Sequence, residues 1–249
     1  MRHDARTMRG GMQAGRGGWW AGAAIAMLCL LAAGPASANP VVRFTTNLGT
    51  FDVELFEAQV PTTVTNFLSY VNAGSYTNSI IHRSTTDNPA DIQIVQGGGF
   101  VLTTTATSAS LDPIATGAPI LLDAILPNLQ GTIAMARTID PDSATSGWYF
   151  NVTDNPQLNA TPGVPGTGYT VFGRIVPGDL GVLDAIAGVR VFNASAELGP
   201  AFSELPLFAP ELNPNNLVMV NSIAAVPEPT TIALALTGLL GLAVLRRRA

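Results

Sequence analysis

Residues 131–152 read GTIAMARTIDPDSATSGWYFNV, and this stretch decides the fold. Two short apolar and aromatic runs flank a polar middle that contains a proline. Short apolar runs bounded by turn residues are typical of buried strands. We therefore expect one strand over Gly131–Ala136 and a second over Trp148–Thr153.

The segments on both sides continue this pattern of short strands. Residues Val41–Leu55 are predicted to form a β-hairpin, because apolar residues alternate with polar ones on each side of a turn at residues 47–49. The body of the chain is therefore expected to be mostly β. Its remaining strands are expected over Ser79–Arg83, Ile92–Gln96, Tyr169–Ile175 and Leu217–Ile223.

Two amphipathic helices are expected near the ends of the body. In Pro61–Asn72 and Gly178–Ala187 apolar residues recur at helical spacing. The Thr-, Ser- and Ala-rich residues 103–118 are expected to form a loop, and the Pro- and Asn-rich residues 193–216 to wrap over the surface. Many short strands with one helix near each end favour a closed barrel with helical plugs, because closure removes exposed strand edges.

The first 38 residues have the three parts of a secretory signal peptide. Four arginines precede an apolar run over residues 19–33, and Ala36-Ser37-Ala38 supplies small residues for cleavage. We expect signal peptidase to remove residues 1–38. A retained N-terminal anchor is the alternative, although the apolar run is short for a membrane span.

The mature body is strongly acidic. Residues 39–225 contain five arginines, no lysine and fifteen acidic residues, a net charge of about −10. Such a surface repels phosphate backbones, which argues against nucleic-acid binding. The only cysteine, Cys29, lies in the signal peptide, and His82 is the only histidine of the body. Neither a thiolate site, a zinc site nor a Ser-His-Asp triad is expected.

The last 24 residues form a separate tail. Residues 226–249 contain Pro-Glu-Pro, an apolar run over residues 230–245 and three terminal arginines. The run is slightly shorter than the ~20 residues of a comfortable span, and the arginines would stay on the cytoplasmic side. The tail resembles the PEP-CTERM sorting motif. The resemblance implies a short transmembrane helix and removal by an exosortase in a Gram-negative bacterium, whereas an unprocessed tail anchor is the alternative.

Three segments of the body resemble cyclophilins. Residues 81–83, Ile-His-Arg, and residues 94–100, Ile-Val-Gln-Gly-Gly-Gly-Phe, are similar to the family's Phe-His-Arg and Gln-Gly-Gly-Gly-Phe signatures. Residues 131–137 are similar to its Gly-Thr-Leu-Ala-Met-Ala-Arg strand, and residues 143–152 to the strand that follows. Weaker matches occur in family order, so the resemblance extends over residues 41–223.

The resemblance implies an eight-stranded antiparallel closed β-barrel capped by two α-helices, formed by residues 39–225. It implies peptidyl-prolyl cis/trans isomerase activity on proline-containing polypeptides, no cofactor or metal, and a monomer. Catalysis is assigned to Arg83, with His82 beside it and Gln96 in the groove. Substrate binding is assigned to Met135, Ala136, Trp148, Tyr149, Leu158 and Tyr169.

The chemistry of the reaction explains these residue types. Rotation about an X-Pro bond faces a barrier of ~18–20 kcal/mol, because amide resonance must be broken. No covalent bond forms or breaks, so neither a nucleophile nor a metal is needed. A guanidinium is a rigid fork of charged donors that can hydrogen-bond the proline nitrogen in the twisted state. Arg83 would thereby favour the transition state over both ground states, provided that it points into an apolar hollow.

Three polar or small residues depart from the family pattern. Gln93, Gly147 and Gln157 stand where an apolar or aromatic residue, a glutamine and an aromatic residue are usual. An alternative function is therefore a proline-peptide-binding module with weak or no catalysis, acting as a surface or exopolysaccharide-associated protein. A third is a matrix protein in which the tail is the functional part. In each case we expect export across the inner membrane to the periplasm, cell surface or extracellular matrix.

Overall fold

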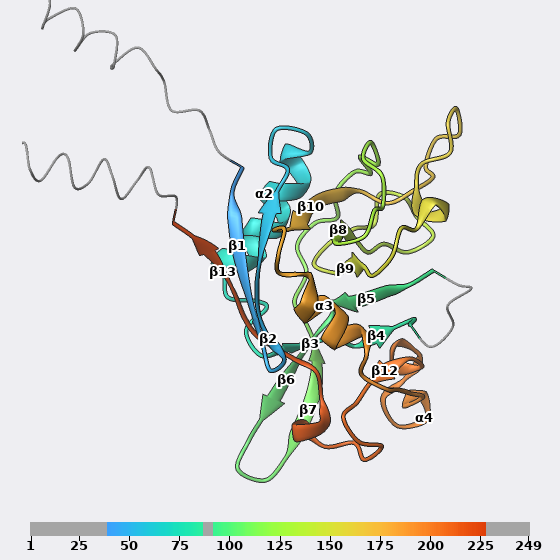
Figure 1. The fold of residues 1–249 in the computed structure, drawn as a ribbon. Helices are drawn as coiled ribbons and strands as arrows, with labels where there is room; N and C mark the ends of the chain where they lie inside the picture. The colour runs from blue at the N-terminus through green and yellow to red at the C-terminus, as the bar shows by residue number, and fades with distance from the viewer. Residues whose placement is uncertain (1–38, 87–91, 228–249) are drawn as a thin grey trace, which may run out of the picture. The chain divides into compact units, whose positions relative to one another are not determined.

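The computed structural model describes residues 39–86 and 92–227 (Figure 1). The predicted signal peptide and the apolar run of the predicted tail lie outside these residues. Within the two described ranges, no helix is long and apolar enough to cross a membrane.

The described residues form one large antiparallel sheet and a small two-stranded one. In the large sheet the strands follow the order β4-β5-β9-β8-β10-β2-β1-β13-β3-β6-β7. Its strands are β1 (Val41–Thr46), β2 (Gly49–Leu55), β3 (Ser79–Ile80), β4 (Arg83–Ser84), β5 (Ile94–Gly97), β6 (Phe100–Thr104), β7 (Ala109–Pro113), β8 (Thr132–Met135), β9 (Trp148–Asn151), β10 (Val171–Ile175) and β13 (Met219–Val226). The small sheet pairs β11 (Val191–Phe192) with β12 (Leu205–Pro206).

The prediction of a mostly β body is confirmed, but eight strands in a closed barrel are not. The ladder contains eleven strands and is open, with β4 at one end and β7 at the other. Residues 79–84 nevertheless contact distant parts of the sheet: Ile81 N donates to Val218 O at 2.9 Å, and His82 N donates to Gln96 O at 3.0 Å. The extra strands include β6 and β7, which form a hairpin where a loop was expected over residues 103–118. Threonine is common in strands as well as in loops, so a threonine-rich segment can form a hairpin when its strands find partners.

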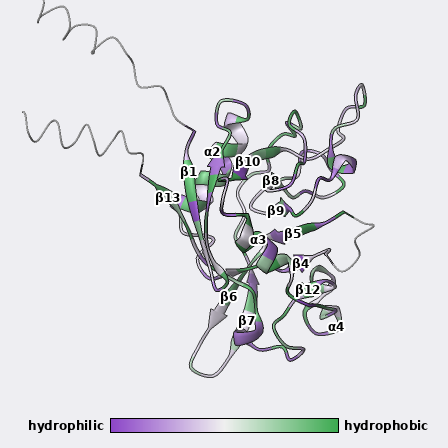
Figure 2. Cartoon of the chain, viewed as in Figure 1, coloured by the Kyte–Doolittle hydropathy of each residue, from purple (hydrophilic) through white to green (hydrophobic). Residues whose placement is uncertain are grey.

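Strand alternation separates the two faces of β8 and β9. Ala134 lies opposite Tyr149, and Met135 lies opposite Trp148. Met135 and Trp148 belong to the main hydrophobic core, whereas Ala134 and Tyr149 belong to a smaller cluster on the other face. Because side chains alternate along a strand, the residues of β8 and β9 are divided between the core and the outer face. Polar and apolar residues are likewise interspersed along β1 and β13 (Figure 2).

Both predicted helices are present. Helix α2 (Pro61–Asn72) begins at its proline, where the missing N–H leaves no hydrogen bond unmade, and buries Val64, Phe67 and Val71. Helix α3 (Leu180–Ala187) buries Leu183 and Ile186 and begins two residues later than expected.

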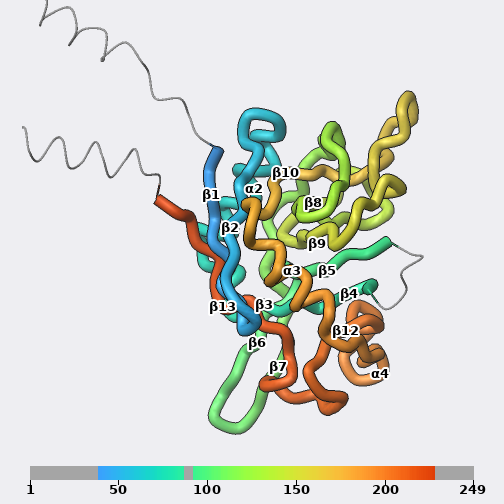
Figure 3. The backbone as a smooth tube through the Cα atoms, viewed as in Figure 1, coloured from blue at the N-terminus to red at the C-terminus, as the bar shows by residue number. Residues whose placement is uncertain are grey.

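The chain after α3 does more than wrap the surface. Residues 191–206, called here the returning segment, contain β11, helix α4 (Ser195–Leu198), the 3-10 helix η2 (Pro200–Phe202) and β12. The tube view shows this orange stretch passing beside β4 before the chain enters β13 (Figure 3). Phe202 and Leu205 anchor it in a small apolar cluster with Ile80 and Leu217. This anchoring brings the returning segment to the strand that carries Arg83.

Candidate functional site

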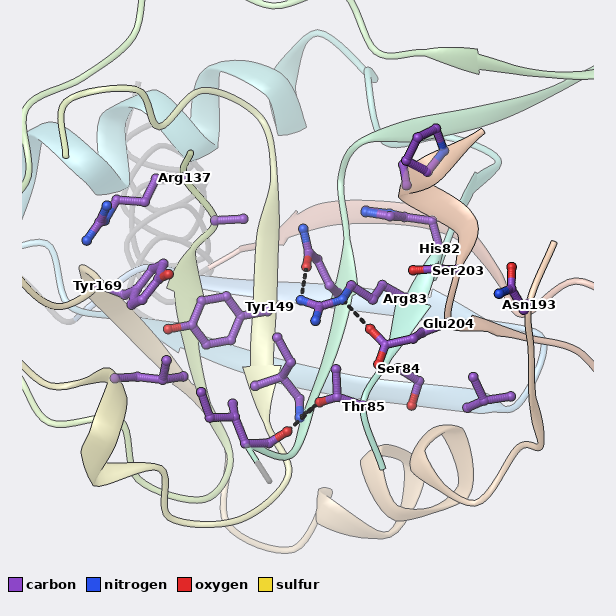
Figure 4. A pocket seen from close by; sticks show the side chains of 18 of the residues that line it. His82, Arg83, Ser84, Thr85, Arg137, Tyr149, Tyr169, Asn193, Ser203 and Glu204 are labelled. Carbon is purple, nitrogen blue, oxygen red and sulfur yellow. Dashed lines mark hydrogen bonds and ion pairs between the residues drawn. The ribbon is translucent and has the colours of Figure 1, made fainter. Parts of the chain in front are cut away.

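A cavity of about 950 Å³ opens between the sheet and the returning segment (Figure 4). Strands β4, β5 and β9, the residues after β8, and Leu158 and Tyr169 form one side, called here the sheet wall. The other side is formed by residues of the returning segment, among them Phe192, Pro200 and Glu204. The cavity is therefore bounded by two parts of the chain that lie far apart in sequence.

The structure brings seven of the nine predicted site residues to this cavity. Met135 and Trp148 do not line it. They are 2 % and 0 % exposed and lie in the main core, because strand alternation turns them away from the face that carries Ala136 and Tyr149. These two side chains therefore lie in the core and not at the cavity. The seven that line the cavity are His82, Arg83, Gln96, Ala136, Tyr149, Leu158 and Tyr169.

Arg83 has acceptors on two sides of its guanidinium. Its Nε donates to Glu204 Oε2 at 2.7 Å, and its Nη1 donates to Gln96 Oε1 at 3.5 Å. The Arg83 side chain remains 40 % exposed. A guanidinium carries five N–H donors, and the described residues accept from two of them. Three donors therefore have no acceptor among the described residues.

Gln96 lies beside Arg83 because the two residues are cross-strand partners. Strands β4 and β5 pair Arg83 with Gln96 and Ser84 with Val95. Directly opposed residues of an antiparallel pair project to the same face of the sheet, with Cβ atoms ~5 Å apart. The separation of these two residues in sequence therefore does not prevent their contact.

His82 is a buried, neutral imidazole. It is 5 % exposed and makes edge contacts with Phe100 and Phe202, with ring centroids 5.2 and 6.4 Å away. Burial, and secondarily the positive charge of Arg83, lowers the pKa of His82 to about 4. Among the described residues its Nδ1 has no hydrogen-bond partner. The imidazole therefore packs between aromatic rings and carries no charge at neutral pH.

The sheet wall contains two tyrosine rings, and a hydrogen bond to Asn128 fixes one of them. Tyr149 donates its hydroxyl to Asn128 Oδ1 at 2.8 Å, and burial raises the pKa of this phenol. The Tyr169 ring meets the Tyr149 ring edge-on at 5.7 Å. The Arg137 guanidinium lies over the Tyr169 ring, with its Cζ 4.6 Å from the ring centroid. Leu158, from the 3-10 helix η1 (Pro156–Leu158), completes an apolar floor.

None of the three residues that depart from the family pattern lines the cavity. Neither Gln93 nor Gln157 lines it, and Gln157 is exposed. Ile92 and Ile94 line the cavity on either side of position 93. Gly147 lies beside Ala136, where a Cβ would come within 3.4 Å of the alanine methyl group.

Among the cavity residues that sequence reasoning missed, two are charged, Arg137 and Glu204. Arg137 belongs to the motif of residues 131–137, so the motif itself could have identified it. Glu204 lies 121 residues after Arg83 in a segment without a recognisable motif, and no sequence signal marks it. Within residues 39–86 and 92–227, no group of three or more His, Cys, Asp or Glu side chains is arranged to hold a metal ion.

Comparison with known proteins identifies the family of both parts of the chain. Residues 41–200 match the model of cyclophilin type peptidyl-prolyl cis-trans isomerases, and residues 225–248 match the PEP-CTERM protein-sorting motif. The chain is 40 % identical over 168 residues to a peptidyl-prolyl cis-trans isomerase of Acinetobacter baylyi, covering 67 % of this chain and 81 % of that one. It is also 40 % identical over 152 residues to peptidyl-prolyl cis-trans isomerase B of Escherichia coli, covering 60 % of this chain and 85 % of that one.

A solved structure supports the fold independently. The cyclophilin type peptidyl-prolyl cis-trans isomerase of Cryptosporidium parvum superposes with a TM-score of 0.52 at 20 % identity, covering 77 % of this chain and 99 % of that one. The chain therefore belongs to the cyclophilin-type peptidyl-prolyl cis-trans isomerase family and carries a PEP-CTERM sorting motif at its C-terminal end.

Proposed function

We propose that the body of this chain catalyses cis/trans isomerisation of X-Pro bonds in exported or surface proteins and thereby assists their folding. One observation carries the proposal: the cavity combines the Arg83 guanidinium with Gln96 and an apolar, aromatic wall. These are the two features that the reaction requires, a fixed cationic donor and a pocket for the proline ring.

The reaction follows from amide chemistry. Uncatalysed X-Pro rotation takes roughly tens to hundreds of seconds at room temperature. As the bond twists, the proline nitrogen regains a localised lone pair that can accept a hydrogen bond. An available N–H of Arg83 would donate to that lone pair only in the twisted state, which lowers the barrier without tightening ground-state binding.

The sheet wall would hold the proline ring while the rest of the peptide rotates. Tyr149, Leu158 and Ile94 belong to one apolar cluster, and all three line the cavity. Gln96 would hold Arg83 or a substrate carbonyl. The neutral His82 would shape the cavity beside Arg83 rather than transfer a proton, because its lowered pKa leaves it uncharged.

A second candidate function is a proline-peptide-binding module with little catalysis. Gly147 favours it, since this glycine lies beside Ala136 of the cavity at the position where a glutamine is usual, so a hydrogen bond to the peptide would be missing. This candidate predicts saturable peptide binding with little acceleration. The matrix-protein alternative instead predicts that deleting residues 226–249 alone reproduces the loss of the whole gene.

The export route is part of the proposal. Signal peptidase would cut after Ala38, and an exosortase would remove the tail from residue 226 onward after a transient stay in the membrane. The mature body, residues 39–225, would act in the periplasm, on the cell surface or in the extracellular matrix as a monomer without cofactor. Its net charge of about −10 supports the absence of nucleic-acid partners.

We also infer that residues 79–84 act as one bent strand that closes the barrel.

The test compares the purified full-length wild type with Arg83→Ala on a short Ala-Pro peptide, by protease-coupled assay or NMR exchange. Losing the donor to the twisted state should reduce kcat/KM by about 100-fold, in the range seen when a single transition-state donor is removed. Arg174→Ala is the matched control, because Arg174 lies outside the cavity and also pairs with a glutamate. Equal acceleration by wild type and Arg83→Ala would reject the catalytic role of Arg83, and no acceleration by the wild type would reject the isomerase function.

A further inference from the structure

We propose that Glu204 is a positioning residue for Arg83: its carboxylate fixes the Nε edge of the guanidinium so that the remaining donors face the bound peptide. This role deepens the isomerase function proposed above and presupposes it. It also gives the returning segment a part in the reaction. Among the described residues that line the cavity, Glu204 is the only acidic one.

The backbone at Glu204 is held rigidly on both sides. Phe202 is 3 % exposed and Leu205 is fully buried, and both pack into the apolar cluster that anchors the returning segment. The Ser84 N–H donates to Glu204 O at 2.8 Å. Glu204 thus binds two consecutive residues of β4, Ser84 through its backbone and Arg83 through its side chain.

The two acceptors of Arg83 come from different parts of the fold. Glu204 reaches Nε from the returning segment, and Gln96 reaches Nη1 from β5. Figure 4 shows the guanidinium between Glu204 on one side and Tyr149 on the other. Because a guanidinium is planar, one acceptor on each of two edges fixes both the direction and the tilt of its plane. The bond to Glu204 is the shorter of the two, at 2.7 Å against 3.5 Å.

Orientation is the main effect of this pair. The Arg83 and Glu204 side chains are 40 % and 39 % exposed, so water screens much of their Coulomb attraction. A donor that is already aimed needs no ordering when the peptide bond twists. Peptide binding depends mainly on the apolar sheet wall, so loss of the pair should lower kcat and leave KM nearly unchanged.

Three substitutions in the full-length chain separate position from charge. Glu204→Ala should lower kcat by about tenfold, since small displacements of a catalytic group have effects of this size or larger. Glu204→Gln should restore most of the rate, because its amide oxygen still accepts from Nε. Glu204→Asp keeps the charge but shortens the side chain, so it should behave like Glu204→Ala. Glu211→Ala is the control, as this acidic residue lies later in the chain and outside the cavity.

A second readout does not depend on activity. The chain contains twelve arginines, so an arginine Nε–Hε NMR spectrum contains at most twelve signals, and the Arg83→Lys variant identifies the Arg83 signal. We expect a slowly exchanging Arg83 Nε–Hε signal in wild type and in Glu204→Gln. In Glu204→Ala and Glu204→Asp it should shift and exchange at least about tenfold faster with water, since the charge-assisted bond is lost.

The outcomes distinguish this inference from the proposed function. An inactive wild type with a protected Arg83 signal would reject the isomerase function while leaving the pairing intact. An active wild type whose Glu204→Ala variant keeps full kcat and an unchanged Arg83 signal would overturn the positioning role. Equal losses in Glu204→Ala and Glu204→Gln would also overturn it. If Glu204→Ala fails to fold, Glu204→Asp decides the question, because it retains the carboxylate and all backbone contacts.

Discussion

The two walls of the cavity are built in different ways. The sheet wall continues the main core outward, because alternate residues of β8 and β9 face the core and the cavity. The returning segment rests on a small separate cluster around Phe202 and Leu205. The first wall supplies aromatic surface and the second supplies one carboxylate, Glu204, to Arg83. Stability and catalysis should therefore depend unequally on the two walls.

Breaking the core beneath the sheet wall should have the largest effect. Trp148 is fully buried and packs edge-on against Phe44, Tyr76 and Phe150. Trp148→Ala should lower the free energy of unfolding by about 4 kcal/mol, since it removes apolar contacts and leaves a cavity. Urea unfolding followed by circular dichroism measures this loss. A loss below about 1 kcal/mol would contradict the core assignment of Trp148.

His82 lies where the two walls meet and makes their contact pH-dependent. Its folded pKa of about 4 lies below the unfolded value of 6.5, so at intermediate pH the unfolded chain binds a proton that the folded chain excludes. The contribution of the neutral His82 to the free energy of unfolding is present in full above pH 6.5. The free energy of unfolding then falls by up to about 3 kcal/mol as the pH decreases toward 4. Urea midpoints measured from pH 7 to pH 4.5 should show this loss.

His82→Phe is the matched variant for that titration. It keeps an aromatic ring beside Phe100 and Phe202 but has no titrating group. Its stability should change much less between pH 7 and pH 5. An identical pH dependence in wild type and His82→Phe would show that other groups cause it.

Removing one hydroxyl from the sheet wall should have a smaller effect. Tyr149→Phe deletes the bond to Asn128 Oδ1, and this oxygen still accepts from Asn151 Nδ2 at 3.2 Å. The free energy of unfolding should fall by about 1 kcal/mol, the net value of one buried hydrogen bond. A loss above about 3 kcal/mol would mean that the Asn128 network fails as a whole.

The smallest effect is expected for an ion pair outside the cavity. Arg174 pairs with Glu54 across β10 and β2 at 2.9 Å, and the Arg174 side chain is 54 % exposed. Arg174→Ala should change the free energy of unfolding by less than about 1 kcal/mol, because water screens exposed pairs. Thermal unfolding measures it. A larger loss would contradict the expected difference between the two ion pairs, because we expect the Arg83–Glu204 pair to affect the rate of isomerisation and the Arg174–Glu54 pair to affect very little.

The sheet wall could be predicted from the sequence and the returning segment could not. Arg83, Gln96 and Tyr149 stand in motifs whose alternation and order are visible in the chain itself. Met135 and Trp148 belong to the same motifs, but alternation within a strand of unknown register does not say which face meets the cavity.

The remainder depended on tertiary contacts. Glu204 reaches Arg83 only because Phe202 and Leu205 are buried against Ile80, a contact between segments that share no local pattern. The β6–β7 hairpin was missed because threonine and serine suit both loops and strands, and pairing decides between them. Strand count and closure were therefore less predictable than the presence of the two helices.

The most direct measurement of the central claim is Arg83→Lys in an NMR exchange assay on an Ala-Pro peptide. Lysine keeps the positive charge but lacks the planar fork that Glu204 and Gln96 hold. We predict that acceleration of isomerisation falls by at least about tenfold while peptide affinity stays within about twofold. Wild-type acceleration by Arg83→Lys would contradict the account, because a point charge alone would then suffice.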